Sequence, residues 1–216
     1  TTNAHRSHFI IILVRTSDED SRHAGLSQFL VDLDTPGVTV RPIRDITGEE
    51  HFNEVLFEDV MLDENALVGR EGQGWTQVMA ELAFERSGPE RFLSAYALLP
   101  IMIDHIRAEG EQSLGSFHIG RAVARLATLR QMSIAVASEL EGDRQPVWAA
   151  SCVKDLGTGF EQSLPEIAQI LLDGAPVSGD RGDVLARLIQ LAPSFSLRGG
   201  TREILRGIIA TGLGVR

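Results

Sequence analysis

A glutamate followed by an arginine, Glu85-Arg86, is the first feature of this sequence that could do chemistry. Apolar residues at 82–84 precede the pair, so the Glu85 carboxylate would lie on an otherwise apolar part of a helix. Burial penalises a charged carboxylate and raises its pKa toward the working pH, which suits a general base. Glu85 is therefore a candidate base, and the alternative is a surface residue paired with Arg86 or Arg91.

A second feature lies far downstream, where Arg198-Gly199-Gly200-Thr201 leads into the helix expected at residues 201–211. The free amides and the dipole of a helix N-terminus suit anionic or polar ligand atoms. Gly199, Gly200 and Thr201 are therefore candidate ligand-binding residues. The alternatives are that Thr201 only caps the helix and that Glu203 only complements the helix dipole. The turn itself contains no carboxylate.

Other reactive residue types in the sequence have simpler explanations. The only cysteine, Cys152, excludes an intrachain disulfide, suits a reducing cytoplasm and is expected to be structural. His5 and His8 lie close together, but no third ligand is near in sequence, so no metal site is expected. Trp75 follows Gly74 and is expected to pack in the core at the start of a helix.

Composition limits the classes of function. A net charge of -10 argues against a nucleic-acid surface, although local arginines could still bind a phosphorylated ligand. The apolar run at residues 9–14 is too short to cross a membrane and predicts a buried strand. No signal peptide is recognisable, which favours the cytoplasm, and the chain looks as if it starts inside a domain.

The elements that must position these residues fall into two groups. Apolar and alternating runs predict strands in the first part of the chain, and Pro36-Gly37 predicts a turn between two of them. Three- and four-residue spacing predicts helices after Gly74, with Pro89 and Pro100 dividing the first. The expected fold class is α+β, with a small antiparallel barrel or sandwich followed by an all-α bundle. The expected strands are 8–16, 26–33, 38–43 and 53–60, and the expected helices are 75–108, 117–141, 147–173, 183–192 and 201–211.

A set of short motifs follows one order along the chain. They are Thr2-Asn3-Ala4, Arg15-Thr16, Pro36-Gly37-Val38, residues 52–60, 67–69 and 72–75, Glu85-Arg86 and residues 199–204. This co-linear set resembles the acyl-CoA dehydrogenase family. The resemblance implies the end of a middle β-domain at residues 1–68 and a C-terminal helical bundle at residues 69–216 that drives tetramerisation. It also implies an N-terminal α-helical domain that is absent from this chain.

The resemblance implies an oxidoreductase of lipid metabolism that uses FAD to remove hydrogens from the α and β carbons of an acyl-CoA. Many members place the base in the turn before the Gly-Thr of the last motif. The isovaleryl and long-chain branches place it on the helix, which matches Glu85, whereas Glu81 and Glu90 do not align. Hydride would pass to flavin N5, and an electron-transfer flavoprotein is the expected acceptor.

The resemblance also assigns ligand contacts. Thr2 and Asn3 would lie near the flavin, and the alternative for Thr2 is an ordinary residue at the start of a strand. Gly199, Gly200, Thr201 and Glu203 would help to bind the cofactor, and Arg86 and Arg91 the substrate. The tryptophan expected to stack on the flavin would precede Thr1, so this chain alone is not expected to retain FAD.

Departures from the family pattern concern the arginine that clamps the FAD pyrophosphate of a neighbouring subunit. Glu109, Gly110 and Glu111 stand in its place, His118 replaces a glutamine, and the segment 172–176 replaces an ADP-binding loop. A carboxylate there would repel a pyrophosphate. The chain further resembles actinobacterial steroid-type members that form α2β2 heterotetramers, so a heteromer is favoured over a homotetramer. A non-catalytic structural subunit and an acyl-CoA oxidase on the same scaffold remain alternatives.

Overall fold

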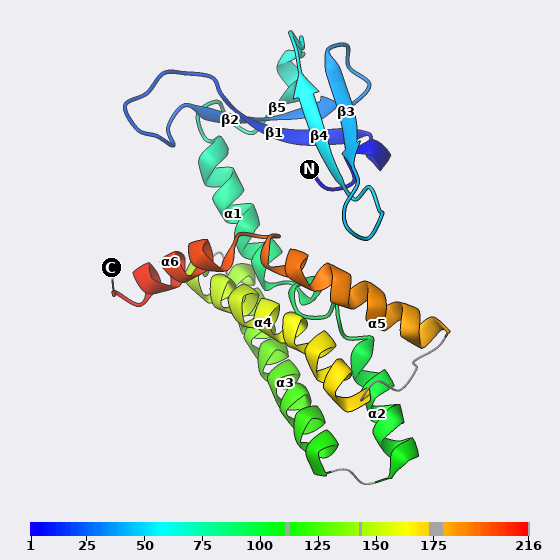
Figure 1. Cartoon of the computed structure of the whole chain (residues 1–216). Coiled ribbons are helices and arrows are strands. Elements are labelled where there is room, and N and C mark those ends of the chain that lie inside the picture. The colour runs from blue at the N-terminus through cyan, green and yellow to red at the C-terminus, as the bar shows by residue number, and fades with distance from the viewer. Residues whose placement is uncertain (111–112, 143, 173–178, 216) are drawn as a thin grey trace. The chain divides into compact units, whose positions relative to one another are not determined.

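The computed structural model describes residues 1–110, 113–142, 144–172 and 179–215. Glu111 and residues 173–176, which figure among the departures from the family pattern, lie outside these ranges. The contacts within the chain divide it into two compact units, Thr1–Ala80 and Glu81–Arg216. Figure 1 shows the strands in the first unit and most of the helical length in the second. The α+β class expected from the sequence is confirmed.

The first unit contains two antiparallel sheets. In one sheet β2 lies between β1 and β5, with Ile12 opposite Phe29, and in the other Val40 of β3 is opposite Val55 of β4. The described residues of this unit keep the two sheets separate and do not close them into a barrel. The strands are β1 (Phe9–Arg15), β2 (Leu26–Asp32), β3 (Val38–Ile43), β4 (Phe52–Phe57) and β5 (Leu67–Val68).

The strand β1 forms where its run of β-branched residues predicts it, but its burial differs from the prediction. Phe9 and Ile11 are more than half exposed, whereas Val31 on the paired strand β2 is fully buried. Successive side chains of a strand point to opposite faces of the sheet, so an apolar run is buried on both faces only if both are covered. The expectation of a fully buried strand at residues 9–14 was therefore wrong.

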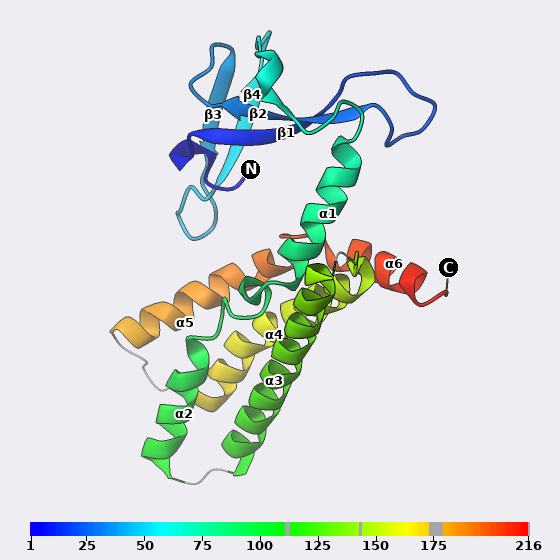
Figure 2. The same cartoon turned by 180° about the vertical axis from the view of Figure 1, so that it is seen from behind.

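The second unit is a helical bundle that α4 organises. Fourteen of its residues are buried, and Phe160 and Leu164 are fully enclosed with Leu98 and Met102 of α2. Burying each such side chain stabilises the fold by roughly 1.5–3 kcal/mol. Both Figure 1 and the view from behind in Figure 2 show α3 and α4 side by side. The helices are α2 (Leu98–Glu109), α3 (Ser113–Glu141), α4 (Val147–Leu172), α5 (Asp180–Leu191) and α6 (Arg202–Gly212), with short 3-10 turns η3 (Pro89–Arg91) and η4 (Ala192–Ser196).

The helix α1 (Gly74–Ser87) begins in the first unit and ends in the second. The sequence placed a single helix at 75–108 with breaks at Pro89 and Pro100. The first break is confirmed because α1 ends at Ser87 and η3 begins at Pro89. Pro100 lies in the first turn of α2 and breaks no helix. A proline is tolerated in a first turn because its missing N–H has no helical partner there. No helix in the described ranges combines the length and apolar character needed to cross a membrane.

Candidate active site around the Gly-Gly turn

The Glu85 carboxylate lies near the end of α1 and its two oxygens have different surroundings. Oε1 forms an ion pair with the guanidinium of Arg91, whose Nε also donates to the Glu85 carbonyl at 2.9 Å. Oε2 is buried and accepts no hydrogen bond from the described residues. The side chain as a whole remains one-third exposed, at 33%. The pairing with Arg91 that the sequence left open is therefore present, and one oxygen of the carboxylate stays free.

Arg86 connects α1 to the Gly-Gly turn. Its side chain is buried, and its Nε donates to the carbonyl of Gly199 at 3.0 Å. Burial lowers the pKa of Arg86, and the charge of Glu85 partly offsets this effect. Its Nη1 is buried and has no hydrogen-bond partner among the described residues. Arg86 thus fixes the turn and retains one unused donor beside it.

The turn itself requires glycine. Gly199 and Gly200 have φ angles of 67° and 102°, which side chains other than glycine rarely adopt. A Cβ added at Gly199 would lie 3.4 Å from Oε2 and 3.5 Å from Oε1 of Glu85. The carboxylate that α1 supplies therefore reaches the place where a side chain at position 199 would begin.

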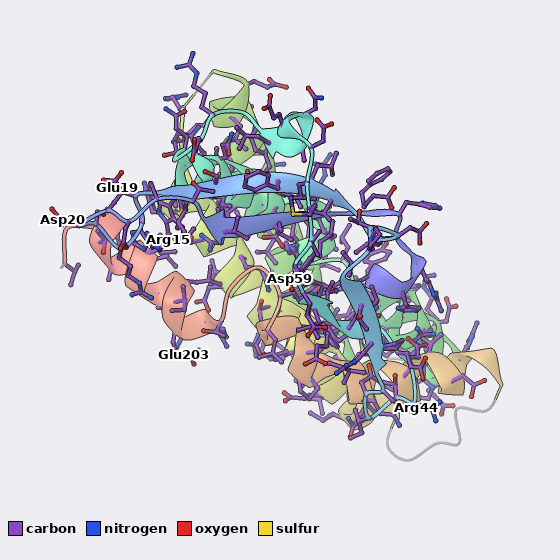
Figure 3. All side chains as sticks on the ribbon, turned by 90° about the horizontal axis from the view of Figure 1, so that it is seen from above. Arg15, Glu19, Asp20, Arg44, Asp59 and Glu203 are labelled. Atoms are coloured by element: carbon purple, nitrogen blue, oxygen red, sulfur yellow. The ribbon has the colours of Figure 1, made fainter. Side chains whose placement is uncertain are left out.

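The start of α6 differs from a simple threonine cap. Thr201 occupies the N-cap position, but its side chain makes no capping hydrogen bond to the helix backbone. The Glu203 carboxylate instead accepts from its own amide and from the Thr201 hydroxyl, and these bonds lower the pKa of Glu203. Figure 3 shows the Glu203 side chain projecting outward from α6. Capping by the Thr201 side chain was wrong, whereas a first-turn acid at position 203 fits the structure.

A buried group that the sequence analysis missed lies beneath the turn. Lys154 on α4 is fully buried, and its Nζ donates to the Thr158 hydroxyl and, at 2.9 Å, to the Phe195 carbonyl. Its Cε lies 3.3 Å from the position of a Cβ at Gly199. One signal could have found it, because Lys154 is the only lysine in a chain that is otherwise rich in arginine.

A second buried carboxylate, Glu161, joins three segments around the same turn. It accepts from the amide of Ser94 at 2.8 Å and forms an ion pair with Arg198 at 2.9 Å. Arg198 also donates to the Ser94 hydroxyl at 2.8 Å, and its Nε is buried without a partner in the described part of the chain. The residue that precedes the two glycines is therefore anchored to α4.

Gly157 brings α4 close to the segment that holds Arg91. A Cβ at Gly157 would lie 2.5 Å from the carbonyl oxygen of Arg91 and 3.2 Å from the Cβ of Phe92. Only a glycine allows this approach of helix and backbone. Since Arg91 binds Glu85, the contact at Gly157 also helps to position the carboxylate.

Thr2 and Asn3 belong to the first unit and so lie outside the group of residues that the second unit brings together. Thr2 is exposed and bridges to Phe52, and Asn3 has a φ of 55° and donates its amide to His51 at 2.8 Å. These contacts suit the ordinary role of residues at the start of a strand and leave a flavin contact as a prediction.

The remaining candidates have structural partners. The ring of His5 shares a hydrogen bond with Asn53 at 2.8 Å, and Trp75 stacks on His23 with centroids 4.1 Å apart. Burial, and then Asp155, raise the pKa of the Cys152 thiol. Within the described ranges, no group of three or more His, Cys, Asp or Glu residues is arranged to hold a metal ion.

Comparison with known proteins connects this site to one family. The family model of the acyl-CoA dehydrogenase middle domain matches residues 1–60, and that of the acyl-CoA dehydrogenase C-terminal domain matches residues 72–214. Acyl-CoA dehydrogenase IpdE1 of Mycobacterium tuberculosis is 34% identical over 218 residues, which cover 97% of this chain and 56% of that protein. The chain thus spans about half the length of this curated relative.

Solved structures share the fold. A structure named Tcur3481-Tcur3483 steroid ACAD G363A variant superposes with a TM-score of 0.86 at 24% identity, over 99% of this chain and 59% of that one. Butyryl-CoA dehydrogenase from Megasphaera elsdenii gives a TM-score of 0.84 at 18% identity, over 100% of this chain and 58% of that one. The two family models and the 34% identical relative show that the chain belongs to the acyl-CoA dehydrogenase family.

Proposed function

We propose that the protein containing this chain removes one hydrogen from each of the α and β carbons of an acyl-CoA thioester, with Glu85 as the base. The observation that carries the proposal is the free oxygen of Glu85, which is buried and has no hydrogen-bond donor among the described residues. An acceptor in this state can take a proton without first breaking a bond to the protein. Arg91 holds the other oxygen and so orients the carboxylate.

The position of this oxygen supports the same role. In family members whose base lies in the turn, the carboxylate would extend from the residue that Gly199 replaces here. The Glu85 carboxylate comes within van der Waals distance of that position, at 3.4 Å. A carboxylate can thus reach the same place either from the turn, as in those members, or from the helix, as Glu85 does here. Gly199 has no side chain and leaves room for the Glu85 carboxylate.

The donors around the turn fit a bound flavin or thioester. Arg86 Nη1 and Arg198 Nε are buried N–H groups without acceptors in the described residues, and such groups gain from a polar ligand atom. We propose that these donors, with Gly199, Gly200 and Thr201, hold polar atoms of FAD or substrate. We propose flavin contacts for Thr2 and Asn3 separately. FAD, when bound, would supply the hydride acceptor, and an electron-transfer flavoprotein would reoxidise it.

Replacement of Glu85 by glutamine tests the proposal. Glu85→Gln keeps the shape of the side chain but removes its ability to accept the α proton, so α-proton exchange should fall about 10³-fold. The measurement is deuterium incorporation at the α carbon of a panel of straight-chain, branched and steroid side-chain acyl-CoAs in D2O. Dehydrogenation with electron-transfer flavoprotein and with oxygen as acceptors is measured in parallel.

The matched control is Glu81→Gln, which removes an exposed carboxylate one turn earlier on α1. It should leave exchange unchanged. Full exchange and turnover in Glu85→Gln would instead support the alternative, a structural subunit that stabilises a catalytic partner. Turnover with oxygen but not with the flavoprotein would indicate an oxidase.

We also propose that the subunit works in a heteromer and that its substrate class is the steroid side-chain type. Glu109, where the family has its clamp region, is the exposed last residue of α2 and is followed by Gly110 at a φ of 84°. A cation lies about two turns into α3, where the Arg121 guanidinium sits 5.5 Å from the centre of the Phe117 ring. An acidic end on α2 supports a partner that supplies the pyrophosphate clamp.

A further inference from the structure

The only lysine of the chain is buried, and its ammonium group is removed from water. Lys154 is fully buried, and the acceptors of its hydrogen bonds, Thr158 and the Phe195 carbonyl, are both neutral. The pKa of Lys154 is lowered from 10.5 to about 8, and burial is the largest cause. The charges of Arg198 and Arg91 also lower this pKa, whereas those of Glu161 and Glu85 raise it. The ammonium therefore loses its proton at a pH well below that of an ordinary lysine.

The side chains of Lys154 and Glu85 both approach Gly199. A Cβ at this glycine would lie 3.3 Å from the Cε of Lys154 and 3.4 Å from the Oε2 of Glu85. The two side chains therefore border the same small space above the turn, with no side chain between them at position 199. Both Glu85 oxygens border this space, since Oε1 lies 3.5 Å from the same position, and Oε2 is the one that Arg91 does not bind.

The other charged groups around Lys154 already have partners of their own. Arg91 pairs with Glu85, Arg198 pairs with Glu161, and Arg86 donates to the Gly199 carbonyl. Like Arg86, Lys154 is bonded only to neutral acceptors in the described residues. Its charge is balanced through space, and this makes it sensitive to the ionisation of Glu85.

We propose that Lys154 is a positioning residue for the Glu85 carboxylate, acting through its charge and not through contact with substrate. A protonated Lys154 stabilises the ionised carboxylate, and a neutral Lys154 leaves Glu85 a stronger base. When Glu85 takes up a proton, the proton affinity of Lys154 falls, because the coupling between two titrating groups is reciprocal. The proposal rests on the role of Glu85 as base.

The first test measures the coupling from the side of the lysine and needs neither substrate nor flavin. Lysine labelled with ¹³C at Cε gives a single signal from this chain, whose pH titration is followed by NMR. The wild-type midpoint should lie at about 8. Glu85→Gln removes a nearby negative charge, so the midpoint should fall by about half a pH unit. Glu81→Gln, which removes an exposed charge on the same helix, should not move it.

Equal midpoints in Glu85→Gln and Glu81→Gln would overturn the proposal. Since residue 154 is unchanged in both variants, the result does not depend on whether a lysine variant folds.

The second test measures the coupling from the side of the base. The pH profile of α-deuterium exchange of an acyl-CoA is recorded for wild type, Lys154→Met and Lys154→Arg. Reciprocity predicts that the acidic limb of this pH profile shifts to higher pH by the same half unit in Lys154→Met. In Lys154→Arg, which keeps the positive charge, the limb should not shift. An unshifted limb in Lys154→Met, with exchange still dependent on Glu85, would overturn this inference alone. Exchange that does not depend on Glu85 would overturn the proposed function instead.

Discussion

At the scale of single residues, the site combines three side chains that each have a buried polar atom without a hydrogen-bond partner in the described part of the chain. Glu85 Oε2, Arg86 Nη1 and Arg198 Nε are buried polar atoms without partners among the described residues. An unpaired buried polar atom costs about 1–3 kcal/mol, so native structures contain few of them. Three around one turn indicate a place where ligand atoms complete the hydrogen bonding.

The buried lysine leads to a prediction about stability and pH. Its pKa of about 8 in the folded protein lies below the ordinary value of 10.5, so the unfolded state binds more protons between these two values. The free energy of unfolding should therefore gain a contribution as pH rises through this window. Lys154→Met lacks this contribution, so its stability relative to wild type should fall by roughly 3 kcal/mol between pH 8 and 10.5. Urea unfolding of both proteins across this range checks the prediction, and a constant difference would contradict it.

At the scale of elements, α4 positions the site because it carries both Lys154 and the glycine beneath Arg91. Gly157→Ala would place a methyl group 2.5 Å from the Arg91 carbonyl, so helix and backbone must move apart. Overpacking of this kind costs about 1–3 kcal/mol, and the loss of Arg91 alignment should also slow α-proton exchange. Urea unfolding and the exchange assay measure the two effects.

The same helix offers a matched control. A Cβ at Gly159 meets only the ends of arginine side chains, the nearest at 3.6 Å. Gly159→Ala should therefore stabilise the protein by about 0.5–1 kcal/mol through helix propensity. If the two variants behaved alike, the close approach at Gly157 would not matter to the fold.

The helix α1 shows why an element and a domain boundary need not coincide. Its first residue packs against the sheet of the first unit, since a Cβ at Gly74 would lie 2.8 Å from the backbone of Ser27. Its last residues, Glu85 and Arg86, serve the site of the second unit. We propose the domain boundary at residue 68, since residues 61–71 lie between the two matched family models.

At the scale of the whole molecule, the flavin content of the assembled protein tests the proposed heteromer. The full-length protein is purified alone and after co-expression with the product of a neighbouring gene, as a candidate partner. We expect little flavin in the protein alone and about one flavin per pair of unlike chains, because Glu109 would repel the pyrophosphate. Glu109→Gln should raise the flavin content of the protein alone, whereas Glu141→Gln should not. Full flavin in a homotetramer of the wild type would contradict the heteromer.

Several features could be predicted from the sequence because they depend on local chemistry. The β-branched and alternating runs indicated four strands, and the apolar spacing indicated the helices, with ends that differ by a few residues. Glu85-Arg86 and the Gly-Gly turn stood out because a carboxylate on an apolar helix and two adjacent glycines are unusual as local patterns. These features need only neighbouring residues to be recognised.

The contacts that build the site join residues far apart in the chain. Arg86 and Gly199 are separated by 113 positions, and Glu161 and Ser94 by 67. The burial of Lys154 likewise depends on which segments pack together. The sequence by itself determined the family, the order of elements and the candidate base. Only the tertiary structure decided which oxygen of that base is free and which buried charge faces it, because hydrogen bonding and burial are set by packing between distant segments.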